Sequence, residues 1–109
     1  MLTQGDVAIA VVQKQVMVVQ GARTHTLRDR WLDVHIFSPF GDRLFLASAV
    51  TSARILSTDI LTIFPSDDAV HLPAEGTLEL HPKAFSEFLE LRARMQKKYE
   101  QLLRDWFEY

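Results

Sequence analysis

The 109-residue sequence contains no cysteine, and this absence excludes several kinds of site. Without thiols there is no disulfide, no thiolate-ligated metal and no cysteine nucleophile. The four glycines stand singly, so no Gly-rich phosphate loop is present. The G-x-S-x-G elbow of serine hydrolases and the H-E-x-x-H helix of zinc proteases are missing too. We therefore expect a protein that is not an enzyme and holds no cofactor.

Four histidines are the remaining candidate metal ligands. His71 and His81 flank the segment PAEG and would approach one another across a hairpin, with Glu75 or Glu79 as an oxygen donor. No two histidines are spaced i and i+4, and none of the usual zinc spacings occurs. His35 is interpreted as a half-exposed strand residue. We expect no metal site.

Long apolar runs and a strong net charge are also lacking. The longest apolar run, VAIAVV, is far short of the roughly 18 residues that span a bilayer, and the opening MLTQGD has no basic leader segment. Twelve basic and fourteen acidic residues leave a charge of −2, which gives no overall attraction to nucleic acid or anionic lipid. These features favour a cytoplasmic protein that does not bind membranes.

What the sequence does contain is a series of short strand patterns over about residues 5–80. Valine and isoleucine, which favour strands, fill residues 7–20 on both sides of the polar break QKQ, which marks either a reversal or a bulge. Residues 31–37 alternate, with Leu32, Val34 and Ile36 predicted on the core face and Phe37 on the other. Pro39 and Gly41 mark a turn into residues 43–50.

Later segments continue this pattern. Residues 52–65 predict a strand, a short helical turn at Ser57–Asp59 and another strand, and two short strands surround PAEG. Length and pattern together favour one domain over residues 1–109, of the α+β class. We expect a small antiparallel, strongly bent β-sheet or an SH3-like barrel, followed by one long C-terminal amphipathic helix.

The helix is predicted over about residues 82–109 and is apolar on an unusually broad face. Pro82 suits the first helical position, because its missing N–H would have no partner there. The apolar sector spans roughly 160°, wider than the stripe of about 100° that packing on one surface needs. Arg92 and Gln96 interrupt it, either specifying register or reaching out from its edge.

The length of the helix leads to the main functional prediction. Twenty-eight helical residues extend about 42 Å, whereas the preceding residues would form a body about 30 Å across, so roughly two turns overhang. We predict that this end packs against a second copy or another protein, since aromatic anchors are typical of interface centres. The predicted interface consists of Tyr99, Leu102, Leu103, Trp106, Phe107 and Tyr109. In the alternative, the same chain covers this face within a monomer.

A second candidate surface is the basic segment ARTHTLRDRW. Arginine binds phosphate oxygens and an indole stacks on a base, so a small barrel could bind single-stranded nucleic acid here. The favoured alternative is a solvated loop, with Arg28 and Arg30 paired to Asp29, Asp33 or a helix glutamate. The nucleic-acid candidates are Arg23, His25, Arg28, Arg30 and Trp31.

Two resemblances accompany these patterns. The segments GDVAIAV and DVHIFSPFGD, with an element before ILTIFP, resemble SH3-like and Tudor-like small barrels over about residues 5–65. The segments GDVAIAV, LASA and SARILSTD, with a terminal helix carrying Trp106, resemble the CcdB and MazF class of toxin barrels. The second resemblance implies gyrase binding through the helix end or RNA cleavage. The segment spacings differ from that class, and the catalytic arginine context of MazF-like enzymes is missing.

Overall fold

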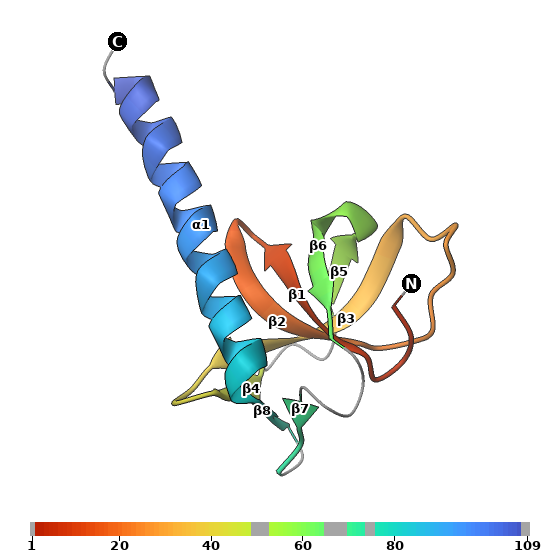
Figure 1. Cartoon of the computed structure of the whole chain (residues 1–109). Coiled ribbons are helices and arrows are strands. Elements are labelled where there is room, and N and C mark those ends of the chain that lie inside the picture. The colour runs from red at the N-terminus through yellow and green to blue at the C-terminus, as the bar shows by residue number, and fades with distance from the viewer. Residues whose placement is uncertain (1, 49–52, 65–69, 74–75, 108–109) are drawn as a thin grey trace.

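The described residues form an antiparallel sheet of eight short strands followed by one long helix, the α+β arrangement expected from the sequence (Figure 1). The structure, a computed structural model, describes residues 2–48, 53–64, 70–73 and 76–107. The strands are β1 (Val7–Val12), β2 (Gln15–Gly21), β3 (Trp31–Pro39), β4 (Leu44–Ala47), β5 (Ala53–Leu56), β6 (Ile60–Ile63), β7 (Val70–His71) and β8 (Thr77–Leu80). A 3₁₀ turn, η1 (Ser57–Asp59), separates β5 from β6, and the helix is α1 (Pro82–Phe107).

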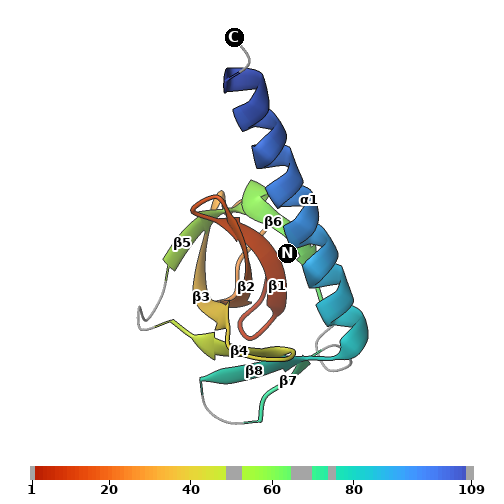
Figure 2. The same cartoon turned by 90° about the vertical axis from the view of Figure 1, so that its left-hand side faces the viewer.

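The sheet is strongly bent around β3, its longest strand. The strand order is β6-β1-β2-β3-β4-β8-β7, and β5 pairs with β3 as well. The first half of β3 pairs with β5 and the second half with β4, so the sheet turns there. Figure 2 shows β4, β8 and β7 lying across the end of the layer that β1, β2 and β3 form. Of the two architectures expected, the described residues form the open, bent sheet and contain no strand pair that closes it into a barrel.

The polar break QKQ contains the turn of the hairpin between β1 and β2. Val12 lies opposite Gln15, so the loop consists of Gln13 and Lys14 alone and is a reversal. Both residues have positive φ, 49° and 67°, as the two central residues of a type I′ turn do. The irregularity in β1 lies elsewhere, between Ile9 and Ala10, where β1 pairs with β6.

Both faces of the sheet are buried, in two separate clusters. One cluster packs beneath α1 and contains Val7, Ile9, Val16, Val18, Phe37, Phe45, Phe64, Leu78, Leu80, Ala84 and Phe88. The other lies on the opposite face and contains Leu2, Ala8, Ala10, Val19, Leu32, Val34 and Ile55. Leu32 and Val34 are buried as expected, but the prediction that Phe37 points away from the core is wrong. Phe37 is buried because the helix covers that face too.

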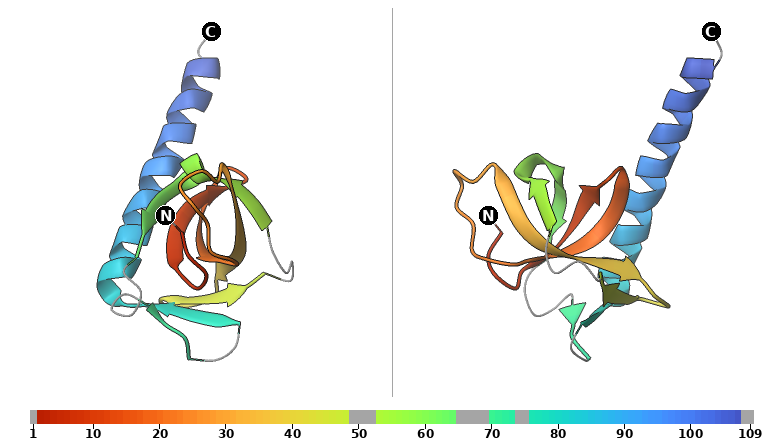
Figure 3. Two further views of the ribbon diagram at one scale, coloured as in Figure 1. Left: turned by 90° about the vertical axis from the view of Figure 1, so that its right-hand side faces the viewer. Right: turned by 180° about the vertical axis from the view of Figure 1, so that it is seen from behind.

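Helix α1 packs on the sheet with its first half only. Phe88 is fully buried, and its ring meets that of Phe45 edge to face with 5.1 Å between centroids. The second half projects well past the sheet, as both views of Figure 3 show. Among the described residues, no helix combines the length and the apolar character of a membrane span.

Candidate protein-interaction surface

The projecting end of α1 carries large apolar side chains in solvent. Leu102 is 54% exposed, Leu103 56% and Trp106 78%, while Tyr99 is half-buried. We call these four residues the distal surface. Of the other predicted interface residues, Tyr109 lies outside the described residues, and Phe107 is described only as the last residue of α1.

The distal surface continues the stripe by which α1 packs on the sheet. Large side chains, all apolar except Arg92, recur at alternating spacings of three and four, the heptad pattern in which a and d positions form one face. This stripe, the seam, comprises Phe85, Phe88, Arg92, Met95, Tyr99, Leu102 and Trp106. Its first members contact the cluster beneath α1, with Phe88 in the core and Phe85 and Met95 packed against it. The stripe therefore extends farther along the helix than the sheet that covers its beginning.

A groove lies where the sheet ends and the exposed part of the seam begins. It has a volume of about 430 Å³ and runs between the β1–β2 hairpin and the middle of α1. Lys14 and Val16 from the hairpin and Pro39 from β3 form one wall; Met95 and Tyr99 belong to the other. This volume lies within the range of about 300–1,000 Å³ that is typical of ligand pockets. The groove is therefore large enough to accept an aromatic side chain.

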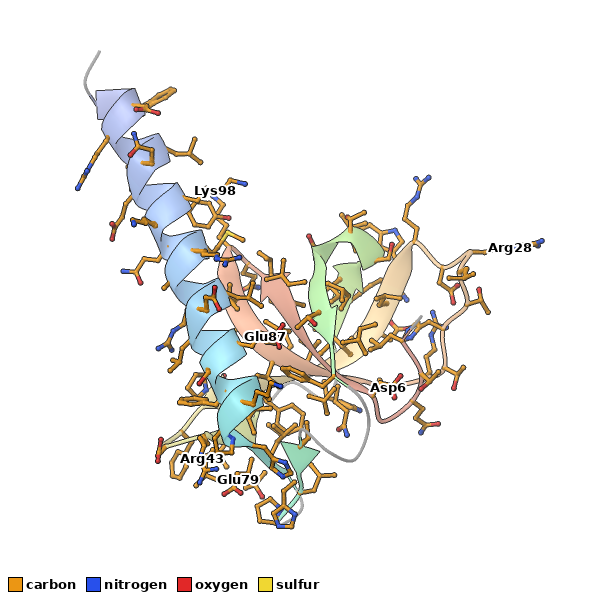
Figure 4. All side chains as sticks on the ribbon, viewed as in Figure 1. Asp6, Arg28, Arg43, Glu79, Glu87 and Lys98 are labelled. Atoms are coloured by element: carbon orange, nitrogen blue, oxygen red, sulfur yellow. The ribbon has the colours of Figure 1, made fainter. Side chains whose placement is uncertain are left out.

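Polar and charged side chains occupy most of the remaining positions of α1. Arg94 pairs with Glu90, and Gln101 donates to Asp105 at 3.2 Å, each one turn away. Such exposed pairs stabilise a helix by a few tenths of a kcal/mol each. Lys98, seen in Figure 4 above the tip of the β1–β2 hairpin, and Asp105 flank one side of the seam with opposite charges.

The basic segment is organised around Asp33. The Arg23 Nε donates to one Asp33 oxygen at 2.7 Å, and the Arg54 Nε donates to the other at 3.3 Å. Arg23 also contacts Asp29 at 3.4 Å. Hydrogen bonds from Arg23, then Arg54, lower the pKa of Asp33, and the backbone N–H of Thr26, with Arg23, lowers the pKa of Asp29. Arginines do pair with Asp29 and Asp33, as the solvated-loop alternative expects, but the arginines that the structure pairs with them are Arg23 and Arg54.

His25 is a buried structural residue of that segment. Its side chain is 1% exposed. The Nε2 atom accepts a hydrogen bond from the Asp33 backbone N–H at 2.9 Å, which leaves Nδ1 to donate to the Leu2 carbonyl at 3.0 Å. The ring thus ties the N-terminal residues to β3. Its placement removes it from any surface that a nucleic acid could reach.

The remaining candidates of the basic segment lie on the surface. Arg28 and Arg30 are exposed, and Trp31 is half-exposed at the start of β3. In Figure 4, Arg28 extends from the loop at the end of the molecule opposite α1. The structure therefore divides the five predicted residues. Arg23 and His25 hold the loop together, and Arg28, Arg30 and Trp31 face solvent.

The candidate metal ligands that the structure describes are not gathered into a site. His71 pairs with Glu79 across the β7–β8 ladder, while His81 follows β8 and Glu75 lies outside the described residues. Among the histidine and carboxylate side chains that the structure describes, no three are placed to hold a metal ion.

Comparison of the chain with protein-family models, with curated proteins and with solved structures finds no match.

Proposed function

We propose that this protein is a non-enzymatic protein-interaction module that self-associates through the distal surface. The observation that carries the proposal is the exposure of Leu102, Leu103 and Trp106 on the part of α1 that projects past the sheet. Isolated surface leucines are common in proteins. A tryptophan and two leucines within five positions, on a helix end that projects into solvent, form a patch of the kind that interface centres use.

A rough energy balance favours association of two equal surfaces. Burying one leucine or larger apolar side chain contributes about 1.5–3 kcal/mol. Each of the three side chains is already partly buried, so a symmetric dimer, which covers each of them twice, gains about 6–11 kcal/mol. Lost rigid-body freedom costs about 4–15 kcal/mol. A dimer covers the patch twice for one such cost, whereas one copy of the patch against a polar partner gains half as much.

The surface is also self-complementary in charge. Lys98 and Asp105 lie beside the same apolar stripe, so a two-fold axis through the distal surface can bring the cation of each copy near the anion of the other. A different protein partner would need its own matching charges. For this reason we assign the surface to a second copy of the chain.

Sedimentation equilibrium at tens of micromolar tests the proposal. The intact chain is expected to dimerise, whereas a chain truncated after Gln96 and the variant Trp106→Ala are expected to sediment as monomers. Lys97→Ala, a change on the polar side of the same turns, serves as the matched control and keeps the dimer. A monomeric intact chain would overturn self-association, and a pull-down with the intact and truncated chains would then show whether a different protein binds.

Nucleic-acid binding is the second candidate, supported by the exposure of Arg28, Arg30 and Trp31 on one segment. Exposed arginines attract phosphates, and a half-exposed indole offers a stacking surface. A gel shift with single-stranded oligonucleotides at low salt tests this function. Retention that is unchanged after joint replacement of Arg23, Arg28 and Arg30 would eliminate it. Growth arrest on expression in a bacterial host would favour the toxin-like form of this candidate.

A further inference from the structure

The seam of α1 keeps a seven-residue repeat from Phe85 to Trp106 without a break in spacing. A strict heptad is the pattern by which two helices pack along a shared face and coil around each other. The β-sheet supplies the packing surface for the first half of this seam. Beyond Met95 the seam keeps the same spacing, and a second helix would complete it in the same way.

The direction of that second helix follows from the residues that would meet. In a parallel pair each seam position faces itself, which would place Arg92 against the partner's Arg92 and leave Lys98 without an opposite charge. In an antiparallel pair a positions face d positions. Tyr99 then meets the partner's Leu102, and Trp106 meets the partner's Met95. In this register Lys98 lies about two residues, or about 3 Å along the axis, from the partner's Asp105.

We infer that two copies of the chain pair antiparallel through this register, and that the Trp106 side chain of each copy enters the groove of the other. This inference rests on the proposed self-association and specifies its geometry. The groove lies beside Met95 and Tyr99, so the residue that Trp106 faces is part of the groove wall. Methionine next to an aromatic ring packs favourably.

The groove also suits the polar end of an indole. Glu100 and Gln15 line it together with the apolar residues. A buried tryptophan N–H needs a hydrogen-bond acceptor, and a carboxylate or amide oxygen supplies one. Each groove is thus an apolar slot with acceptors at its border, and the exchange of two tryptophans fills both grooves of the dimer at once.

Exchange of charges tests the register. Lys98→Asp and Asp105→Lys each place like charges together at two symmetric sites, and each is expected to weaken dimerisation about tenfold, a penalty of about 1.4 kcal/mol. The double variant restores the opposite charges and should dimerise within about threefold of the parent. Lys97→Asp changes the charge equally on the outer face and should have no effect. Failure of the double variant to recover would overturn the antiparallel register.

The absence of native cysteine permits a direct distance measurement. A spin label at Lys83→Cys lies near the start of α1, and the antiparallel register separates the two labels by about 35 residues of helix, or about 50 Å. A parallel pair would hold them within about 20 Å. A short distance in a sample shown to be dimeric would refute the register and leave self-association standing, whereas a monomeric sample would refute both.

A substitution outside α1 tests whether the Trp106 side chain enters the groove. Pro39 is exposed and lines the groove wall, so Pro39→Glu places a charge where the indole would lie. In a Trp31→Phe background, Trp106 is the only tryptophan. Its emission should shift to the blue as the dimer forms, and Pro39→Glu should abolish the shift and weaken the dimer at least tenfold, about 1.4 kcal/mol. A dimer indifferent to Pro39→Glu would show that the helices pair without filling the groove.

Discussion

Phe88 and Trp106 lie on the same side of α1, five helical turns apart, and have opposite surroundings. Phe88 is 0% exposed between Phe45 and Phe85, and Trp106 is 78% exposed. Eighteen residues at 100° each return a helix to the same orientation, about 27 Å farther along its axis. The difference between the two residues therefore arises from the end of the sheet, because the character of the helix face does not change.

This relationship predicts opposite consequences for two truncations. Phe88→Ala empties a packed site and should lower the free energy of unfolding by about 3–5 kcal/mol. Trp106→Ala should change the unfolding free energy of the monomer by less than about 0.5 kcal/mol. Denaturant unfolding measured well below the dimer dissociation constant separates the two effects, since association stabilises the folded state by mass action. A large loss of monomer stability in Trp106→Ala would mean that the distal surface packs within one chain.

The β1–β2 turn contains a correctable strain. Gln13 and Lys14 both have positive φ, a conformation that costs ordinary residues about 1–2 kcal/mol and glycine little. The paired substitutions Gln13→Asn and Lys14→Gly supply the residues that type I′ turns favour. We expect this double variant to raise the free energy of unfolding by about 1 kcal/mol, measured by urea titration.

A glycine at the neighbouring strand position provides the control for that variant. Gln15 is the first residue of β2, where glycine costs backbone entropy. Gln15→Gly should therefore lower stability, by about 0.5–1 kcal/mol. Equal effects of Lys14→Gly and Gln15→Gly would contradict the assigned turn geometry.

Much of the fold could be predicted because it depends on local sequence. Pro82 starts the helix, the turn at Ser57–Asp59 separates two strands, and PAEG lies between β7 and β8. Phe37 could not be placed, because its burial depends on α1, which is more than forty residues away in sequence. A period-two pattern distinguishes two faces but does not say that both are covered.

The same division holds for the candidate site. The overhang of α1 follows from helix length against body size, quantities that a sequence provides. The groove could not be predicted, because it exists only where folding places the β1–β2 hairpin beside Met95 and Tyr99. The burial of His25 could not be predicted for a related reason. Its segment is polar, but the ring bridges the Leu2 carbonyl and the Asp33 backbone, two groups brought together only by folding.

Gly21 is predicted to be irreplaceable for steric reasons. A Cβ atom at this position would lie 2.3 Å from the Thr3 carbonyl oxygen, a backbone atom that has little room to move. Gly21→Ala should therefore separate the N-terminal residues from β2 and lower the free energy of unfolding by more than about 2 kcal/mol. Gly41, whose Cβ would meet nothing within 4 Å, is the matched control. Thermal unfolding of Gly41→Ala should match that of the parent.

The ion pairs around Asp33 predict a defined response to acid. Arg23 and Arg54 lower the pKa of Asp33 in the folded protein, and Thr26 and Arg23 lower that of Asp29. A lowered folded pKa means that the charged form stabilises the fold. That contribution is complete above the unfolded pKa of about 3.9, and it is lost as the pH falls through the folded values. The stability of the parent should thus decline below about pH 4.

Asp33→Asn isolates the contribution of this carboxylate to the acid response. The amide keeps the shape and the backbone hydrogen bond to His25 but removes the charge that both arginines contact. Urea titrations between about pH 2 and 6 should show lower stability than the parent near neutrality and a smaller loss on acidification. The effect should be modest and should shrink in high salt, because these groups are partly exposed to solvent. Asp42→Asn, at an exposed position for which the described structure contains no ion pair, should retain the pH profile of the parent. An Asp33→Asn variant with the full acid sensitivity of the parent would show that other carboxylates cause the acid response.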